Sequence, residues 1–146
     1  MMGVCDIIGT TLSGWLSDRF DNRVLLCAYY GLRGLSLLYL PYSDFTFYGL
    51  GFFTVFYGLD WIATVPPTVR LTTEHFGAAQ APLVYGWIGA GHQLGAATAA
   101  FGAGVLRVQT NRYVEAFLIA GVGCLVAATM ALMIRRSSSP TQPAQA

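Results

Sequence analysis

The side chains best suited to chemistry are the ionisable groups that interrupt the long apolar stretches of this chain, namely Asp6, Arg33, Asp60 and His92. If those stretches cross a membrane, a charge at a helix centre costs about 2.5–3.5 kcal/mol by insertion measurements, and such residues commonly mark solute or proton pathways. Histidine changes its charge near neutral pH. Solute binding and proton transfer are therefore the chemistry that these residue types favour.

His92 is the first candidate for this role. Along a helix it lies about 15 Å from Pro82, near the middle of a membrane-spanning segment. Gly89, Gly95 and Ala96 leave room beside its ring. The imidazole would bind an anionic solute or carry a coupling proton. The alternative is a hydrogen bond from the ring to the backbone of a neighbouring helix.

Asp60 is the supporting candidate. It shares a helix face with Tyr57 and Thr64 at spacings of three and four residues. This face would contact the solute. The alternative is that Asp60 caps or bridges helices near one end of its own helix.

Asp6 and Arg33 are interpreted as a structural ion pair. Each lies about 18 Å along a helix from the charged loop between residues 14 and 23, so the two stand at similar depth on adjacent antiparallel helices. Opposite charges at matched depth favour pairing. The alternative is a neutral or solvated Asp6 beside an Arg33 that reaches toward the membrane surface.

Composition indicates a membrane protein. Hydrophobic residues make up 55% of the 146 residues and charged residues only 10%, whereas a soluble domain carries about a quarter charged residues. The net charge of +1, with arginine as the sole basic residue type, gives no reason to expect a nucleic-acid partner. Three scattered cysteines argue against a disulfide framework or a metal site, and no cofactor is expected.

The apolar runs have the lengths of membrane spans. Residues 24–41, 45–65, 82–106 and 113–134 are each long enough to cross a hydrocarbon core of about 30 Å. Polar turns are predicted between them, including residues 68–80. Residues 1–15 are interpreted as the end of a helix. The sequence therefore predicts an all-α, polytopic transmembrane bundle with about four complete helices and one partial N-terminal helix, followed by a disordered cytoplasmic tail over residues 135–146.

Arginine placement predicts the orientation. With the charged loop in the cytoplasm, Arg19, Arg23 and Arg70 lie inside, as do Arg135 and Arg136 of the tail. Arg107 and Arg112 then lie outside, and this asymmetry agrees with the positive-inside tendency.

The helix predicted over residues 82–106 is rich in small residues. Gly91 and Gly95 form a small-xxx-small pair, which lets helix backbones approach closely. The pair would provide a sliding surface for conformational change; the alternative is static packing.

The charged loop carries a family resemblance. Gly14, Asp18, Arg19 and Arg23 fall on the pattern of the Asp-Arg loop of the major facilitator superfamily, although Asp21 replaces its second glycine and Val24 its last basic residue. The runs 57–68 and 86–95 resemble the tenth and eleventh helices of bacterial permeases related to monocarboxylate and oxalate-formate carriers. The resemblance covers residues 1–134.

The resemblance implies a secondary active transporter that moves a small solute, an organic anion in these permeases, by alternating access. Residues 82–106 have no Gly-Pro signature, which the fifth helix of an N-terminal half would carry. Residues 1–134 are therefore assigned to helices eight to twelve, so helices one to seven are missing partners. In the family the loop is a gating clasp between helices; the alternative is that its arginines only set topology. The expected location is the bacterial inner membrane.

Two other classes of protein compete with a transporter fragment. One is a small integral membrane scaffold or assembly subunit without transport activity. The other is an intramembrane hydrolase that would use Ser13 or Ser36 with His92, but no Gly-x-Ser-x-Gly or paired-acid motif supports it. The chain is therefore not expected to be an enzyme.

Overall fold

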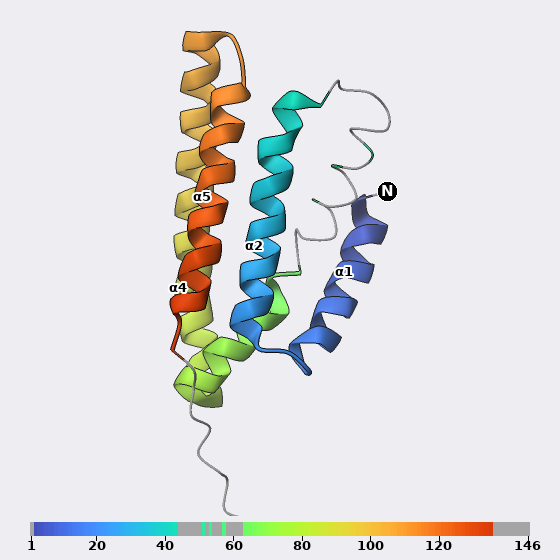
Figure 1. The fold of residues 1–146 in the computed structure, drawn as a ribbon. Helices are drawn as coiled ribbons and strands as arrows, with labels where there is room; N and C mark the ends of the chain where they lie inside the picture. Colours follow the sequence, from blue (N-terminus) through green and yellow to red (C-terminus); the bar gives the residue numbers. More distant parts are fainter. Residues whose placement is uncertain (1, 44–50, 52, 54–56, 58–62, 136–146) are drawn as a thin grey trace, which may run out of the picture.

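The computed structural model describes residues 2–43, 51, 53, 57 and 63–135. In this part of the chain the regular elements are helices: α1 (Met2–Ser17), α2 (Asn22–Tyr39), the short 3₁₀-helix η1 (Leu40–Tyr42), α4 (Val65–Thr110) and α5 (Val114–Met133). The predicted all-α class is confirmed. Helices α2 and α5 run side by side, with α1 on the other side of α2 (Figure 1).

Two of the helices are long and apolar enough to cross a membrane, Asn22–Tyr42 and Val114–Met133. They coincide with the predicted spans 24–41 and 113–134. Large apolar side chains such as Ile119 and Met130 are more than half exposed on α5. A water-soluble helix would bury such a surface, so these side chains are suited to lipid.

The predicted span 82–106 lies within α4, which is much longer than expected. Residues 78–110 alone rise about 50 Å. Among the described helices, this stretch does not reach the hydropathy of a candidate span, because His92, Gln93 and numerous glycines lower its average. The predicted span 45–65 falls almost wholly outside the described residues.

The polar turn predicted over residues 68–80 is wrong, because residues 65–76 form a helix at the lower end of the molecule (Figure 1). Pro66 and Pro67 stand at its start, where a missing backbone N–H costs no hydrogen bond. The hydroxyls of Thr68 and Thr73 donate to the carbonyls of Thr64 and Val69, at 2.6 and 2.9 Å. Threonine can thus satisfy its polar group on the helix itself, so a polar stretch need not be a loop.

Gly77 separates this short helix from the long upper part of α4. Its φ of 75° and ψ of 160° are not helical, and a residue with a Cβ atom rarely adopts such a backbone. The break lets residues 65–76 turn across the end of the bundle while residues 78–110 run along it (Figure 1). The backbone conformation of Gly77 therefore sets the direction of residues 65–76 relative to residues 78–110.

The tightest helix contact joins α2 to α5. A Cβ atom on Gly34 would lie 2.9 Å from the Gly121 carbonyl oxygen, so the two backbones touch at this crossing. A buried apolar cluster lies nearer the charged loop between α1 and α2. It consists of Leu26, Leu71 and Ala131, with Tyr30 packed against it. This cluster ties the short helix at the start of α4 to both α2 and α5.

Gly91 and Gly95 have no such neighbour. Within the described residues, a Cβ atom at either position would meet nothing within 4 Å. The packing role predicted for this pair stays a prediction about segments outside the described residues.

Candidate functional site

A cavity of about 280 Å³ opens between α2, the residues just before and within the start of α4, and the upper part of α4. Its polar wall combines a cation, an imidazole and several hydroxyls. The lining residues are Tyr30, Arg33, Thr64, Val65, Thr68, Tyr85, Ile88, Gly89 and His92. None of the described residues on this wall is acidic, and its cation is the Arg33 guanidinium.

His92 lies on the wall of this cavity, and its side chain is exposed rather than packed into a helix interface. Gly89, which the sequence expects to leave space beside the ring, lines the same cavity. The imidazole is therefore accessible to a solute or to water.

Arg33 also lines the cavity, although the sequence assigned it to a structural pair with Asp6. The Asp6 side chain lies outside the described residues, so that pairing stays a prediction. The Arg33 guanidinium carbon stands 5.7 Å from the centre of the Tyr30 ring, a cation–π arrangement that orients it. Thr64 and Thr68, at the start of α4, line the same cavity as Arg33 of α2.

The other predicted solute residues are only partly brought together. Thr64 lines the cavity, and its carbonyl accepts the Thr68 hydroxyl. Tyr57 stacks on Phe53 with ring centres 5.1 Å apart and is not among the lining residues. Asp60 lies outside the described residues.

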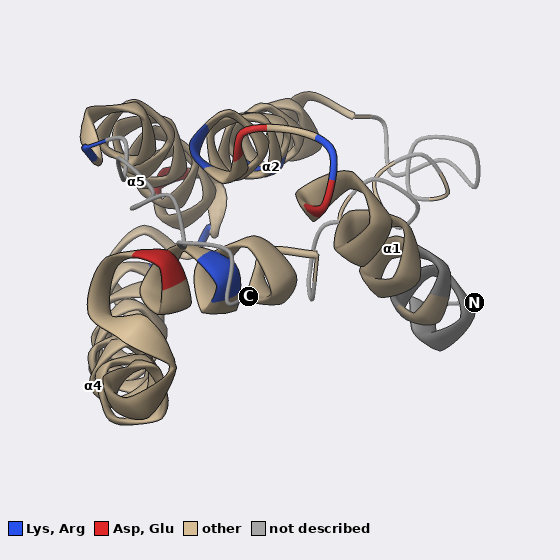
Figure 2. Cartoon of the chain, turned by 90° about the horizontal axis from the view of Figure 1, so that it is seen from below, with Lys and Arg blue, Asp and Glu red and all other residues tan. Residues whose placement is uncertain are grey.

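A second, strongly polar pocket of about 350 Å³ occupies the charged end of the molecule. Figure 2, viewed from that end, shows acidic and basic residues at the adjoining ends of α1, α2 and α4. Asp18 forms an ion pair with Arg70 of the short helix, and Arg70 Nε lies 3.9 Å from Glu74 Oε1. The loop after α1 is therefore linked to the start of α4 by charge.

The remaining loop residues are held locally. Arg19 lies over the Trp15 ring, 4.3 Å from its centre. Gly14 is inside α1, and its carbonyl accepts the Asp18 backbone N–H at 3.3 Å. A Cβ atom at Gly14 would meet nothing within 4 Å, so no described neighbour requires a glycine there.

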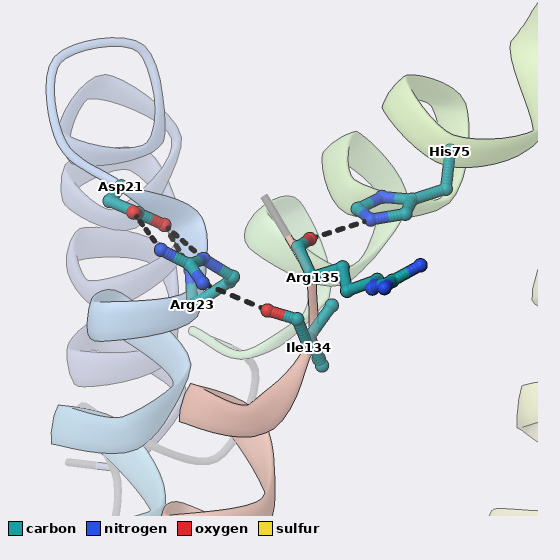
Figure 3. A network of polar contacts seen from close by, with 5 residues as sticks. All are labelled: Asp21, Arg23, His75, Ile134 and Arg135. Carbon is teal, nitrogen blue, oxygen red and sulfur yellow. Dashed lines mark hydrogen bonds and ion pairs between the residues drawn. The ribbon is translucent and has the colours of Figure 1, made fainter. Parts of the chain in front are cut away.

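Asp21, which departs from the family pattern, caps α2. Its φ of −62° is open to any residue, so the replaced glycine is not needed for the turn. Its carboxylate accepts the Arg23 backbone N–H at 3.1 Å. It also accepts two hydrogen bonds from the Arg23 guanidinium, from Nε at 3.0 Å and from Nη2 at 2.6 Å. Arg23 in turn donates to the carbonyl of Ile134, at 2.8 Å (Figure 3). The start of α2 is thereby joined to the end of α5.

Sequence reasoning placed Arg70 on the side of the charged loop but missed its pairing with Asp18, and it missed His75 altogether, because both stand in the segment interpreted as a turn. The His75 ring lies between the carbonyls of Leu71 and Arg135. Helical spacing of Arg70 and Glu74, four residues apart, was an available signal. The capping role of Asp21 was readable too, since Asp directly before an apolar run marks a helix start.

The serines considered for a hydrolase are occupied by backbone contacts. Ser13 is fully buried and donates to the Ala63 carbonyl at 2.5 Å, which ties α1 to the segment before α4. Ser36 donates to the Arg33 carbonyl at 2.9 Å. These hydroxyls hold helices rather than face His92.

Comparison with known proteins is consistent with this architecture. A family model described as the Major Facilitator Superfamily matches residues 1–146. The uncharacterized MFS-type transporter YcxA of Bacillus subtilis (strain 168) is 30% identical over 122 residues, covering 76% of this chain and 28% of that protein. This chain thus spans less than a third of that relative's length. No solved structure gives a significant match. The chain belongs to the major facilitator superfamily, whose members are membrane transporters rather than enzymes.

Proposed function

We propose that this chain forms part of the C-terminal half of a secondary active transporter that moves a small organic anion by alternating access. The observation that carries the proposal is that Arg33 and His92 line one cavity between α2 and α4. Family membership and the small share of the relative that the chain covers support the rest.

The cavity chemistry favours a carboxylate. A guanidinium binds a carboxylate through two parallel hydrogen bonds and stays charged at any physiological pH. Tyr30 and Tyr85 line the same space, and their hydroxyls can donate further hydrogen bonds. A volume of about 280 Å³ suits a small solute, since drug-sized ligands need about 300–1,000 Å³. Mono- and dicarboxylates, as in the monocarboxylate and oxalate-formate carriers, are the proposed solutes.

His92 would couple transport to protons. Its side chain is exposed on the cavity wall, and an imidazole exchanges its proton near neutral pH. A protonated ring adds a second positive charge beside Arg33 and attracts the anion. Loss of the proton removes that charge and favours release. Asp60 is proposed to support this exchange from its neighbouring segment.

The charged end would act as a gate on the cytoplasmic side. Asp18 and Arg70 link the loop to α4 at this end, and four arginines of the described part line the same pocket. Positive charges gather on the cytoplasmic side of membrane proteins, which supports a position of this end on the cytoplasmic side of a bacterial inner membrane. Breaking the Asp18–Arg70 pair would release the loop.

A complete transport path needs a second bundle, because substrate sites of such transporters lie between two pseudo-symmetric halves. Helices one to seven are the proposed partners of this chain, with residues 135–146 as a cytoplasmic tail.

The test is uptake by the complete transporter in proteoliposomes, with radiolabelled acetate, lactate and oxalate as probes. Arg33→Gln is expected to abolish uptake, whereas Arg107→Gln, at the opposite end of α4, should leave it intact. His92→Gln should remove the pH dependence of uptake. Normal uptake by both Arg33→Gln and His92→Gln would overturn the proposed site, and failure of the unsubstituted transporter to move any anion would favour a scaffold instead.

A further inference from the structure

His75 makes two contacts that a neutral imidazole cannot satisfy together. Its Nδ1 lies 2.9 Å from the Leu71 carbonyl oxygen, and its Nε2 lies 2.9 Å from the Arg135 carbonyl oxygen. Carbonyl oxygens only accept hydrogen bonds, so each contact needs an N–H on the ring. Neutral histidine carries one N–H and the imidazolium carries two. Both contacts are hydrogen bonds at the same time only when the ring is protonated.

The Arg135 carbonyl lies just beyond the end of α5. The helix ends at Met133, and its cap Ile134 has a non-helical ψ of 128°. The carbonyls of Ile134 and Arg135 therefore have no helix of their own to bond to and are open to donors from other helices. Arg23 donates to the neighbouring carbonyl of Ile134 at 2.8 Å. Two adjacent carbonyls are thus contacted by Arg23 of α2 and His75 of α4, as Figure 3 shows.

The basic side chains of α2 and α4 at this end are paired with carboxylates, which lowers their repulsion of a positive ring. On the α2 side, the Arg23 guanidinium is paired with Asp21 at 2.6 Å. On the helix of His75 itself, Arg70 is paired with Asp18 and lies near Glu74.

Among the described residues after α5, the basic side chain near His75 is that of Arg135, which extends away from Arg23 in Figure 3. Arg19 on the loop lies over the Trp15 ring. The acids of this end, Asp18, Asp21 and Glu74, line the same pocket as its arginines. The exposed position of His75 gives water direct access to the ring.

We infer that His75 is a proton-operated latch that fastens the end of α5 to the short helix at the start of α4. When the ring is protonated, it donates to Leu71 and Arg135 at the same time. When the proton leaves, one of the two bonds is lost. Leu71 is four residues earlier on the same helix and remains close, so the bond to Arg135 is the one released. Arg23 stays charged and keeps Ile134, so the end of α5 loosens without detaching from α2.

The latch does not rest on the proposed transport of an anion, because it lies at the charged end and uses none of the cavity residues. It would make the mobility of this end depend on proton concentration on its own side of the membrane.

The first test measures a distance in the whole protein in lipid nanodiscs. Spin labels are attached at Thr73→Cys and Leu132→Cys, both exposed positions, after the native cysteines are replaced. Between about pH 5 and 8, where histidine titrates, the distance distribution is expected to broaden and lengthen as pH rises. His75→Gln should give the broad distribution at every pH, and His75→Arg, which cannot lose its charge, the narrow one.

The chain offers a matched control, because it has two histidines. His92→Gln should leave the pH response of the labels unchanged. A response that survives in His75→Gln, or an unsubstituted protein with the same distribution at both ends of the pH range, would overturn the latch.

A second measurement reads the ring directly and does not depend on the labels. In ¹⁵N-histidine protein, the imidazole signals of His75 are identified as those that disappear in His75→Gln. Both ring nitrogens are expected to carry hydrogen at the acidic end of the range. A ring with a single N–H there, in protein whose labels report the narrow distribution, would contradict the proposal.

Discussion

Gly34 and Gly121 bring the backbones of α2 and α5 into contact. A Cβ atom on Gly34 would stand 2.9 Å from the Gly121 carbonyl oxygen, and one on Gly121 would stand 3.1 Å from the Gly34 carbonyl oxygen. Gly34 and Gly121 are both buried. Close backbone approach of this kind is how membrane helices associate when lipid removes the hydrophobic drive between them.

Gly34→Ala should therefore destabilise the protein by about 1–3 kcal/mol, the usual cost of forcing extra volume into a packed contact. The clash is with backbone and with the Leu125 side chain, so little can move aside. Thermal unfolding in detergent measures the effect. Gly31→Ala, one turn earlier on α2, is the control, since its Cβ would meet nothing within 4 Å. Equal melting temperatures for the two variants would contradict the contact.

Asp21→Ala should lower the free energy of unfolding by about 1–2 kcal/mol, because it removes the cap of α2 and the carboxylate that orients Arg23. Asp21→Asn keeps a side-chain oxygen for the cap and should cost less. Denaturant-induced unfolding of the three proteins gives the comparison. If Asp21→Asn were as damaging as Asp21→Ala, the charge rather than the cap would dominate.

The Asp18–Arg70 pair should matter more for conformation than for stability. The side chains are 63% and 44% exposed, and exposed ion pairs contribute about 0.2–1 kcal/mol. Asp18→Arg should free the loop and increase thiol labelling of an added cysteine at Leu71, which is buried. The double variant Asp18→Arg with Arg70→Asp should restore protection. A double variant that labels as fast as the single one would show that the pair is not what holds the loop.

The two ends of the molecule should lie on opposite sides of the membrane. Cysteines introduced at Phe20, which is 60% exposed at the charged end, and at Val108, which is 86% exposed near the far end of α4, report the two sides. A membrane-impermeant maleimide added outside cells should label position 108 and not position 20. A cysteine at Ser138, in the predicted tail, should behave like position 20, and labelling from the other face would contradict the predicted helix count.

The Asp6–Arg33 pair has a distinctive prediction of its own. If the pair exists, Arg33→Leu alone strands a buried carboxylate and should destabilise by about 3 kcal/mol or more. The double variant with Asp6→Leu should recover most of that loss, because no unpaired charge remains. Melting temperatures of both variants decide the matter, and a double variant as unstable as the single one would show that Arg33 has another partner.

The sequence by itself determined the class of protein and the place of the clearest spans. Length and hydropathy are properties of a continuous run, so residues 24–41 and 113–134 could be recognised without knowing their neighbours, and they coincide with α2 and α5. The loop between α1 and α2 was equally readable, because its charges are adjacent in sequence. Residues 68–80 were misread, since threonines that bond to their own helix look the same in sequence as threonines of a turn.

Only the tertiary structure decided which of these residues meet. Arg33 and His92 share a cavity, and Asp18 and Arg70 share a charged end. These meetings depend on how each helix is rotated about its axis and on the break at Gly77. A single sequence fixes neither, because rotation is set by packing against other helices, as at Gly34 and Gly121. Gly77, with its positive φ, changes the direction of the chain between residues 65–76 and residues 78–110. The residues next to it in sequence do not indicate that direction.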